Sequence, residues 1–336
     1  MRATGAPRHG SLRKGLAMGE DTKVYVGIDV GGTSVKEGLF DSEGNLLGKV
    51  SVPTPPLVDE TGYAAVTGGI DQLLADTGRQ ITDVLGVGFA LPCPVPASGE
   101  ITLAANITVD GAGLKDAVAA HCTEAAVRYV NDANAAAMGE LWRGAAAGRR
   151  SMVMVTIGTG LGGGVVVDGK VIDGAFGAGG EIGHITVNPA EERECGCGRH
   201  GCLEQYASAT GMVNDYLRAC EAHGATPHEL SGPSDSRTVF QLCREGDPIA
   251  LEAEGVFTDY LSHGLAIISA VVDPEIYVLG GGASASSDVY LDDLRRKFAE
   301  RALSVSTTTP IEIASLGNDA GIIGAAYVSL QAAREA

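Results

Sequence analysis

Basic residues and long apolar runs are both scarce in this chain of 336 residues. Lys and Arg number 24 against 42 Asp and Glu, which gives a formal net charge of −18. A protein of this charge has no general attraction for nucleic acid or anionic lipid, which argues against a DNA-coating role. The most apolar stretch, 264–272, is shorter than the ~18 residues of a membrane span. We therefore expect no nucleic-acid partner and no membrane partner.

An apolar signal-peptide core is also missing near the first residue. The first twenty residues are mostly small or basic, so we expect 1–22 to be a disordered tail, with Met18 as an alternative start. We also expect the protein to be cytoplasmic. A disulfide framework is not indicated either, because the seven cysteines are odd in number and three of them crowd into 195–202. In a reducing compartment such crowding indicates a metal site.

Glycine, by contrast, is abundant. The chain has 48 glycines, about twice the usual share, without a collagen period. They predict tight turns and close approaches of backbone to ligand. The length corresponds to about two domains, and a hydrophobic content of 45% is enough for their cores.

The glycine turns belong to an internal repeat. The order strand, glycine turn, strand, aspartate turn, strand occurs at 23–52 and again at 151–172. Ile28 falls on Ile157, and Asp41 on Asp168, each pair about 130 residues apart. The repeat predicts two similar half-molecules, each of which presents one glycine turn to a cleft between them.

The first turn contains Asp29, Gly31, Gly32 and Thr33, and Lys36 follows. Adjacent glycines have no Cβ, so successive backbone N–H groups can point at an anion, and Thr33 adds a hydroxyl donor. Asp29 would then face a magnesium ion or the transferring phosphate. A plain hairpin turn is the alternative interpretation, and the motif favours the phosphate site.

The second turn matches a dinucleotide-binding fingerprint, Gly158-x-Gly160-x-x-Gly163. That fingerprint requires a helix immediately afterwards, whereas the residues that follow, 165–169, predict a strand and a turn. We therefore reject the dinucleotide interpretation and predict a second phosphate-holding hairpin that faces the first.

Asn131 and Asp132 lie where a predicted strand ends and an alanine-rich helix begins. Asp is a favoured helix N-cap, so the residues alone favour a cap at Asp132 over a catalytic group. A carboxylate beside a cleft can also accept a proton from an attacking hydroxyl.

The most specific motif is the cysteine loop, with Cys195, Cys197 and Cys202 in the spacing C-x-C-x₄-C. A closed zinc site has four ligands, so three thiolates leave room for one imidazole. His184, upstream, is the nearest candidate for that imidazole, and His200, inside the loop, competes with it. We expect a structural zinc, because four protein ligands leave no open position for water.

These motifs together resemble the ROK family of repressors, open reading frames and sugar kinases. They cover 23–330 in the family's order, and the run 202–211 is most similar to bacterial ATP-dependent glucokinases. The resemblance rests on the following segments: Asp29-Val-Gly-Gly-Thr33 with Lys36, Asn131-Asp-Ala-Asn134, Gly158-Thr-Gly160, Glu181-Ile-Gly-His184 and Cys195-Gly-Cys-Gly-x-x-Gly-Cys202-Leu-Glu204.

The resemblance implies an α/β protein with the actin-like ATPase fold, two ribonuclease-H-like domains around a central cleft. The smaller domain would comprise 23–133 plus about 318–336, and the larger domain, with the zinc loop, 134–317.

The resemblance also implies roles for individual residues. Asp132 matches the catalytic base, which reverses the preference for a cap. The zinc ligands would be His184, Cys195, Cys197 and Cys202. The sugar contacts would be Asn106, Asn131, Asp132, Glu181, His184 and Glu204. The nucleotide contacts would be Asp29, Gly31, Gly32, Thr33, Lys36, Thr159, Gly160, Gly281 and Gly282.

The implied activity is transfer of a phosphoryl group from ATP, with Mg²⁺, to a hexose, with glucose first. Mannose, N-acetylmannosamine, fructose and allose are alternative acceptors, and polyphosphate is an alternative donor. By analogy with the family we expect a homo-oligomer, a dimer or a tetramer. A sugar-sensing repressor is disfavoured, because few residues precede the first glycine turn and the net charge is −18.

Overall fold

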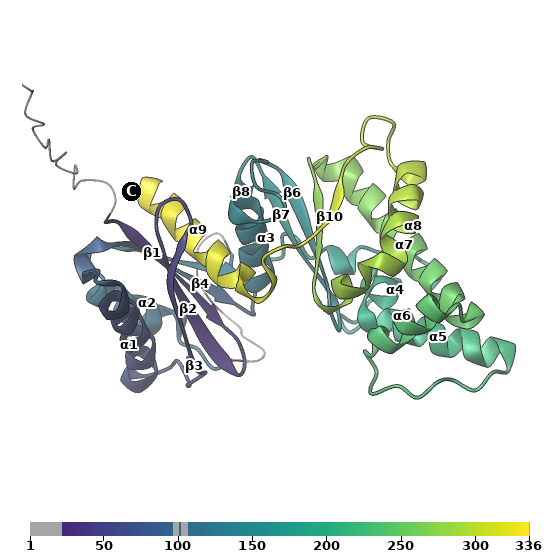
Figure 1. Cartoon of the computed structure of the whole chain (residues 1–336), viewed down its shortest axis with the longest axis horizontal. Helices are drawn as coiled ribbons and strands as arrows, with labels where there is room; N and C mark the ends of the chain where they lie inside the picture. The colour runs from purple at the N-terminus through teal and green to yellow at the C-terminus, as the bar shows by residue number, and fades with distance from the viewer. Residues whose placement is uncertain (1–21, 97–100, 102–106, 336) are drawn as a thin grey trace, which may run out of the picture.

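A computed structural model describes residues 22–96, 101 and 107–335. Asn106, a predicted sugar contact, and almost all of the predicted tail therefore lie outside the described residues. The chain forms two lobes that lie side by side and meet at a pair of helices (Figure 1).

The first lobe is built on a mixed sheet with the strand order β3-β2-β1-β4-β5. Within it β1 pairs antiparallel with β2 and parallel with β4. One face of the sheet buries Val26 and Ile28 against α1 and α2, and the other buries Tyr25 and Phe40 against α9. The elements are β1 (Val24–Val30), β2 (Ser34–Phe40), β3 (Leu46–Pro53), α1 (Glu60–Thr77), η1 (Ile81–Asp83), β4 (Val84–Leu91), α2 (Gly111–His121), β5 (Ala126–Asn131) and α9 (Ala320–Glu335).

The second lobe repeats this plan with the order β10-β9-β6-β7-β8. β6 pairs antiparallel with β7 and parallel with β9, as β1 does with β2 and β4. The predicted repeat is confirmed, because Ile28 and Ile157 lie on corresponding central strands. The strands are β6 (Met152–Ile157), β7 (Leu161–Val167), β8 (Lys170–Val171), β9 (Tyr277–Gly280) and β10 (Ile311–Ile313). The helices are α3 (Asp132–Arg143), η2 (Ile182–His184), α4 (Glu204–Ala207), α5 (Ala209–His223), α6 (Ser236–Glu245), α7 (Pro248–Val272), η3 (Gly282–Ser286), α8 (Ser287–Arg301) and η4 (Gly317–Asp319).

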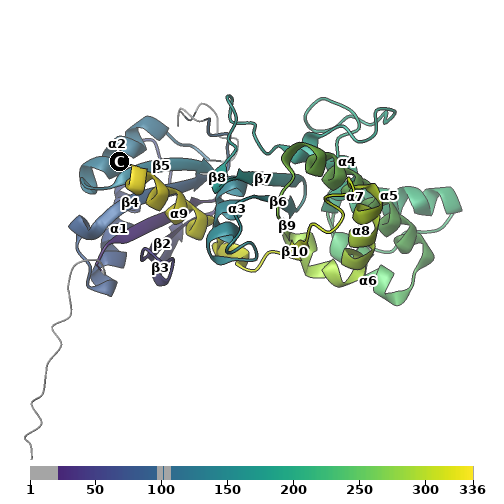
Figure 2. The same cartoon turned by 90° about the horizontal axis from the view of Figure 1, so that it is seen from above.

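Helices α3 and α9 exchange places between the lobes. α3 follows β5 of the first sheet but packs on β7 of the second, and α9 follows β10 but packs on β1 and β4 (Figures 1 and 2). Glycines allow this contact: a Cβ at Gly88 would lie 1.9 Å from the carbonyl oxygen of Ala325, and one at Gly324 would lie 1.7 Å from that of Ala135. The two helices therefore form the joint between the lobes.

Several elements of the second lobe were not predicted. α6, α8 and β10 fall in stretches for which the sequence predicted no element, and two helices, α4 and α5, follow one another directly after the cysteine loop. The break lies at Ser208, whose side chain accepts from the backbone N–H of Gly211 and so begins α5. α8 buries only a narrow apolar stripe, Tyr290, Leu294 and Phe298, within a highly charged segment.

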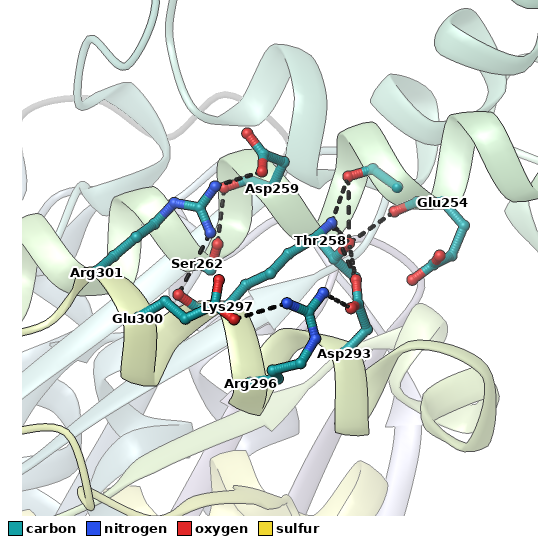
Figure 3. Close-up of polar contacts among 10 residues, drawn as sticks. Glu254, Thr258, Asp259, Ser262, Asp293, Arg296, Lys297, Glu300 and Arg301 are labelled. Carbon is teal, nitrogen blue, oxygen red and sulfur yellow. Dashed lines mark hydrogen bonds and ion pairs between the residues drawn. The ribbon is translucent and has the colours of Figure 1, made fainter.

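A polar network fixes α8 on α7 (Figure 3). The Lys297 side chain is 14% exposed, and its Nζ lies 2.9 Å from Asp293 Oδ2 and donates to Thr258 Oγ1 (2.7 Å) and to the carbonyl oxygen of Gly255 (2.9 Å). Arg301 pairs with Asp259 at the next turn. A partly buried ammonium with this many acceptors is well satisfied, so the network specifies how α8 lies on α7.

α7 is long and apolar enough to cross a membrane by length and composition alone. It nevertheless lies among α5, α6 and α8 and contributes Phe257, Leu261 and Leu265 to the core of the second lobe. A core helix passes the same test as a membrane span, and the packing identifies α7 as one.

The first lobe contains a buried carboxylate with no hydrogen-bond partner. Glu37 on β2 is 0% exposed, and neither of its oxygens is bonded within the described residues. It faces Gly69 of α1, where a Cβ would lie 2.5 Å from the carboxylate. Burial raises the pKa of Glu37 from 4.5 to about 8, so the protonated form predominates in the folded protein at neutral pH.

This shift predicts a loss of stability at alkaline pH. Because the folded-state pKa is the higher one, the folded protein binds the extra proton, and the free energy of unfolding falls as the pH rises from about 4.5 through about 8. Glu37→Gln cannot ionise, so it should exceed the wild type in stability by up to about 5 kcal/mol near pH 9 and lose that advantage near pH 5. Urea titrations at both pH values check this. Glu124→Gln, at an exposed position, is the control and should show the pH dependence of the wild type. The same pH dependence in Glu37→Gln as in the wild type would contradict the prediction.

Candidate active site

The first glycine turn joins β1 to β2 at the junction of the lobes. The backbone N–H of Gly31 donates to the carbonyl of Ser34 (3.0 Å), which closes the hairpin and leaves Gly32 and Thr33 exposed. Lys36 Nζ lies 3.8 Å from Asp29 Oδ2. Burial raises the pKa of Asp29, and the negative charge of Asp132 adds to that rise while Lys36 opposes it. The first turn and Asp132 are therefore electrostatic neighbours.

Asp132 is not the N-cap of α3 that the residues alone favoured. Asn131 is the cap: its Oδ1 accepts from the backbone N–H of Ala133 (3.0 Å) and of Asn134 (3.3 Å). Asp132 is the first helical residue, and its Oδ1 accepts from Ala133 at 2.8 Å. Burial raises the pKa of Asp132, although the hydrogen bond from Ala133 opposes the rise. Since the cap is supplied by its neighbour, the Asp132 carboxylate is not needed to begin the helix.

Asn131 also holds the proline-rich loop after β4. Its Nδ2 donates to the carbonyl oxygen of Cys93 at 3.2 Å, and Cys93 itself is buried. The side chain predicted to contact sugar therefore already fastens two segments of the first lobe together.

The second glycine turn is linked to the cysteine loop by Glu204. Glu204 Oε2 accepts from the backbone N–H of Leu161 (2.9 Å), and a Cβ at Gly160 would lie 2.3 Å from the same oxygen. Thr159, which directly precedes Gly160, is exposed. Glu204 Oε1 lies 3.8 Å from Cys195 Sγ. One carboxylate thus positions the turn against the loop.

His184 and the three cysteines of the loop converge. One ligand atom from each of His184, Cys195, Cys197 and Cys202 lies within 4.8 Å of all the others. His184 Nδ1 is 3.8 Å from Cys195 Sγ, and the sulfurs of Cys197 and Cys202 are 3.7 Å apart. Sulfurs about 2.3 Å from a tetrahedral zinc are about 3.8 Å from one another, so the cluster fits that ion.

The competing ligand, His200, is directed elsewhere. Its Nδ1 lies 3.0 Å from the carbonyl oxygen of Arg193, outside the cluster. The other ring nitrogen of His184, Nε2, lies 4.0 Å from Glu181 Oε2. The imidazole therefore connects the cluster to the exposed carboxylate of Glu181.

The predicted adenosine contacts lie behind the second turn. Gly281 has a φ of 83°, and a Cβ there would lie 2.5 Å from the carbonyl oxygen of Ile157. A separate pocket of about 210 Å³ opens between the turn and the cysteine loop, lined by Thr159, Cys195, Glu204 and Gly211 among others. Gly281 and Gly282 are not among its lining residues.

A family model described as "ROK family" matches residues 25–332. The chain belongs to the ROK family. A glucokinase from Halalkalibacterium halodurans is 36% identical over 317 residues, which cover 91% of this chain and 95% of the relative. This likeness extends over both lobes and the joint between them.

Solved structures of ROK proteins share the fold. The ROK hexokinase from Thermus thermophilus matches with a TM-score of 0.76 and 32% identity, covering 93% of this chain and all of the other. A ROK glucokinase from Streptomyces griseus, solved in complex with glucose and AMPPNP, matches with a TM-score of 0.66 and 31% identity over 92% of this chain and 99% of the other. The fold is the actin-like ATPase fold that the resemblance implied.

Glu140 lies in the joint between the lobes, and the sequence did not indicate its role. It lies on α3, is 0% exposed, and its Oε1 accepts from the backbone N–H groups of Ser315 and Leu316, both at 2.9 Å. Its Oε2 accepts from the N–H of Ala145 at 2.7 Å. Glu140 therefore anchors the segment that leads from β10 into α9. One glutamate among many acidic residues gives no sequence signal of this role.

We expect Glu140→Gln to lower the free energy of unfolding by about 2–4 kcal/mol, because an amide NH₂ then faces a buried backbone donor. Denaturant unfolding measures the change, with Glu245→Gln on the surface of α6 as the control. A loss no larger than that of the control would refute the anchoring role.

Proposed function

We propose that the chain transfers the γ-phosphoryl group of ATP to the 6-hydroxyl of a hexose, and that glucose is the preferred hexose. The observation that most directly supports this proposal is the position of Asp132. Its carboxylate lies beside the Asp29 turn, at the start of the helix that joins the lobes. The glucokinase relative and the complex with glucose and AMPPNP support the acceptor and the donor.

The glycine turns supply the nucleotide end of the site. Gly31, Gly32 and Thr33 present an exposed loop whose N–H groups can meet phosphate oxygens, and Thr159 and Gly160 do the same from the second lobe. Asp29 and Lys36 lie directly behind the first turn. Gly281 and Gly282 would face the adenosine. Magnesium bound with the nucleotide would neutralise phosphate charge near Asp29.

Asp132 would act as the general base. Phosphoryl transfer depends on in-line positioning and charge neutralisation, and a base takes the hydroxyl proton as the nucleophile develops. A pKa raised by burial makes Asp132 a stronger proton acceptor than an exposed aspartate.

The sugar end would be formed from both lobes. Glu181 and the Nε2 edge of His184 lie together in the second lobe, and Asn131 lies next to Asp132 in the first. Glu204 would add an acceptor from the cysteine loop, and Asn106 would add another. Zinc in the Cys₃His cluster would be structural and would order the loop that carries Glu204.

The division into moving parts is also a proposal. We assign 23–133 plus about 318–336 to one domain and 134–317 to the other, since α9 packs on the first sheet and α3 on the second. Closure about the two crossed helices would bring the glycine turns together and exclude water as a competing acceptor. A homo-oligomer and a cytoplasmic location remain expectations of the same proposal.

A coupled assay across hexoses tests the proposal. ATP should support phosphorylation of glucose with the highest kcat/KM among glucose, mannose, N-acetylmannosamine, fructose and allose, and polyphosphate should support less. A higher value for another sugar would correct the acceptor. No turnover with any sugar, together with a gel shift on genomic fragments, would replace the kinase by a repressor.

A further inference from the structure

A large cavity lies between the lobes, away from the proposed active site. Its volume is about 780 Å³, which is in the range of small-molecule sites. None of the residues assigned above to nucleotide, sugar or metal lines it. Its walls come from β5 and α9 of the first lobe and from α3, the 148–150 turn and β8 of the second. We call it the interlobe cavity.

The interlobe cavity is lined by an excess of cations, although the chain as a whole is strongly acidic. The cationic residues are Arg128, Arg149, Arg150, Lys170 and Arg334. The acidic ones are Asp168, Asp173 and Glu335. Two of these acids are already paired: Asp168 lies 3.2 Å from Arg150, and Glu335 lies 3.2 Å from Lys170.

Three arginines are left without a carboxylate within ion-pair distance among the described residues. Arg128 donates only to the backbone carbonyl of Val127, at 3.0 Å. Arg149 acts on Glu275 through space and lowers its pKa, but the Glu275 carboxylate is held mainly by the backbone N–H groups of Arg150 and Ser151. Arg334 lies in the last turn of α9. Positive charge from both lobes therefore remains available to an anion.

Two stacked aromatic side chains also line the cavity. Trp142 of α3 stacks on Tyr327 of α9, with ring centroids 4.9 Å apart and planes 15° apart, and both rings line the cavity. The part of this pair that is not covered by the stacking gives a ligand an apolar contact. Arginines beside an apolar contact suit a small organic molecule that carries a phosphate.

The cavity contacts the helix that carries Asp132. Asp173, on its wall, accepts from Asn134 Nδ2 at 3.1 Å, and Asn134 lies in the first turn of α3. At the other side Gln331 Nε2 of α9 donates to the carbonyl oxygen of Gly169 at 3.0 Å, across the lobes. A ligand here would touch both lobes and so favour one relative placement of them.

We propose that the interlobe cavity binds a sugar phosphate, with the phosphate held by Arg128, Arg149 and Arg334 and the sugar near Trp142. This site is separate from the proposed phosphoryl-transfer site, and its occupancy biases the closure of the lobes.

Trp142 is the only tryptophan of the chain, so its fluorescence reports on the cavity directly. The full chain is titrated with glucose 6-phosphate and with inorganic phosphate, each in the presence of saturating glucose and ADP so that the proposed sugar and nucleotide sites are filled. We expect a saturable change with glucose 6-phosphate that is at least about tenfold weaker in the double variant Arg128→Gln/Arg334→Gln. Arg237→Gln, an exposed arginine on α6, should leave it unchanged.

No saturable change, or a change that the double variant retains in full, would overturn the site. Inorganic phosphate binding as tightly as glucose 6-phosphate would overturn the assignment to a sugar phosphate. Because the readout is binding and not turnover, it fails or succeeds independently of the hexose assay.

Discussion

Asp132→Asn should lower kcat by about 10²–10⁴ while the protein stays folded and still binds sugar. Asn cannot take the hydroxyl proton, but it keeps the shape of Asp and one oxygen for the N–H of Ala133. Steady-state kinetics with ATP and glucose measure the change, and thermal unfolding shows whether the fold is kept.

Asp76→Asn, an exposed aspartate on α1, is the matched control and should leave kcat unchanged. A further readout is the pH profile, because burial raises the pKa of Asp132 above 3.8 and the acid limb of kcat/KM should therefore lie above that value. Near-normal turnover in Asp132→Asn would remove Asp132 from the role of base.

Removal of the metal from the cysteine loop should have the second large effect. We expect one zinc per chain, and its extraction by a strong chelator should lower the melting temperature and abolish glucose turnover, because a structural zinc contributes on the order of 10 kcal/mol to ordering its loop. Glu204 would then lose its fixed position against the second glycine turn. Metal analysis measures the zinc content, calorimetry the melting temperature, and the kinase assay the glucose turnover.

Cys197→Ser is the sharpest variant for this test, because Cys197 is exposed and its replacement leaves no cavity in the core. It should lower zinc content and turnover together. Cys243→Ala, on α6 and outside the cluster, should keep the metal. Full activity and an unchanged melting temperature after complete zinc removal would contradict the structural role.

The sequence predicted the parts of the fold that have strong local signals. Strands β1 and β6 are β-branched runs that end in glycine turns, and their repetition alone indicated two similar lobes. The cysteine spacing likewise predicted a cluster of three thiolates and one imidazole, and the family resemblance chose His184 over His200. The structure brings His184 to the three cysteines. α8 was missed because its apolar stripe, Tyr290, Leu294 and Phe298, is diluted by charged residues on its other faces.

The site residues that sequence reasoning missed depend on long-range placement. Asn and Asp are about equally good N-caps, so only the point at which β5 ends could decide between Asn131 and Asp132. Glu140 meets Ser315 and Leu316, which lie far along the chain, and the interlobe arginines come from separate elements. No local pattern brings such residues together; the exchange of α3 and α9 between the lobes does.

That exchange also sets an order for synthesis. α9 covers the face of the first sheet that carries Tyr25 and Phe40, yet the ribosome makes it only after the entire second lobe. While the chain is growing, that face has no helix of its own on it, and its apolar side chains are open to water or to a chaperone. The first lobe is therefore translated first but its packing is completed last. A nascent chain stalled before residue 320 would expose the uncovered face of the first sheet.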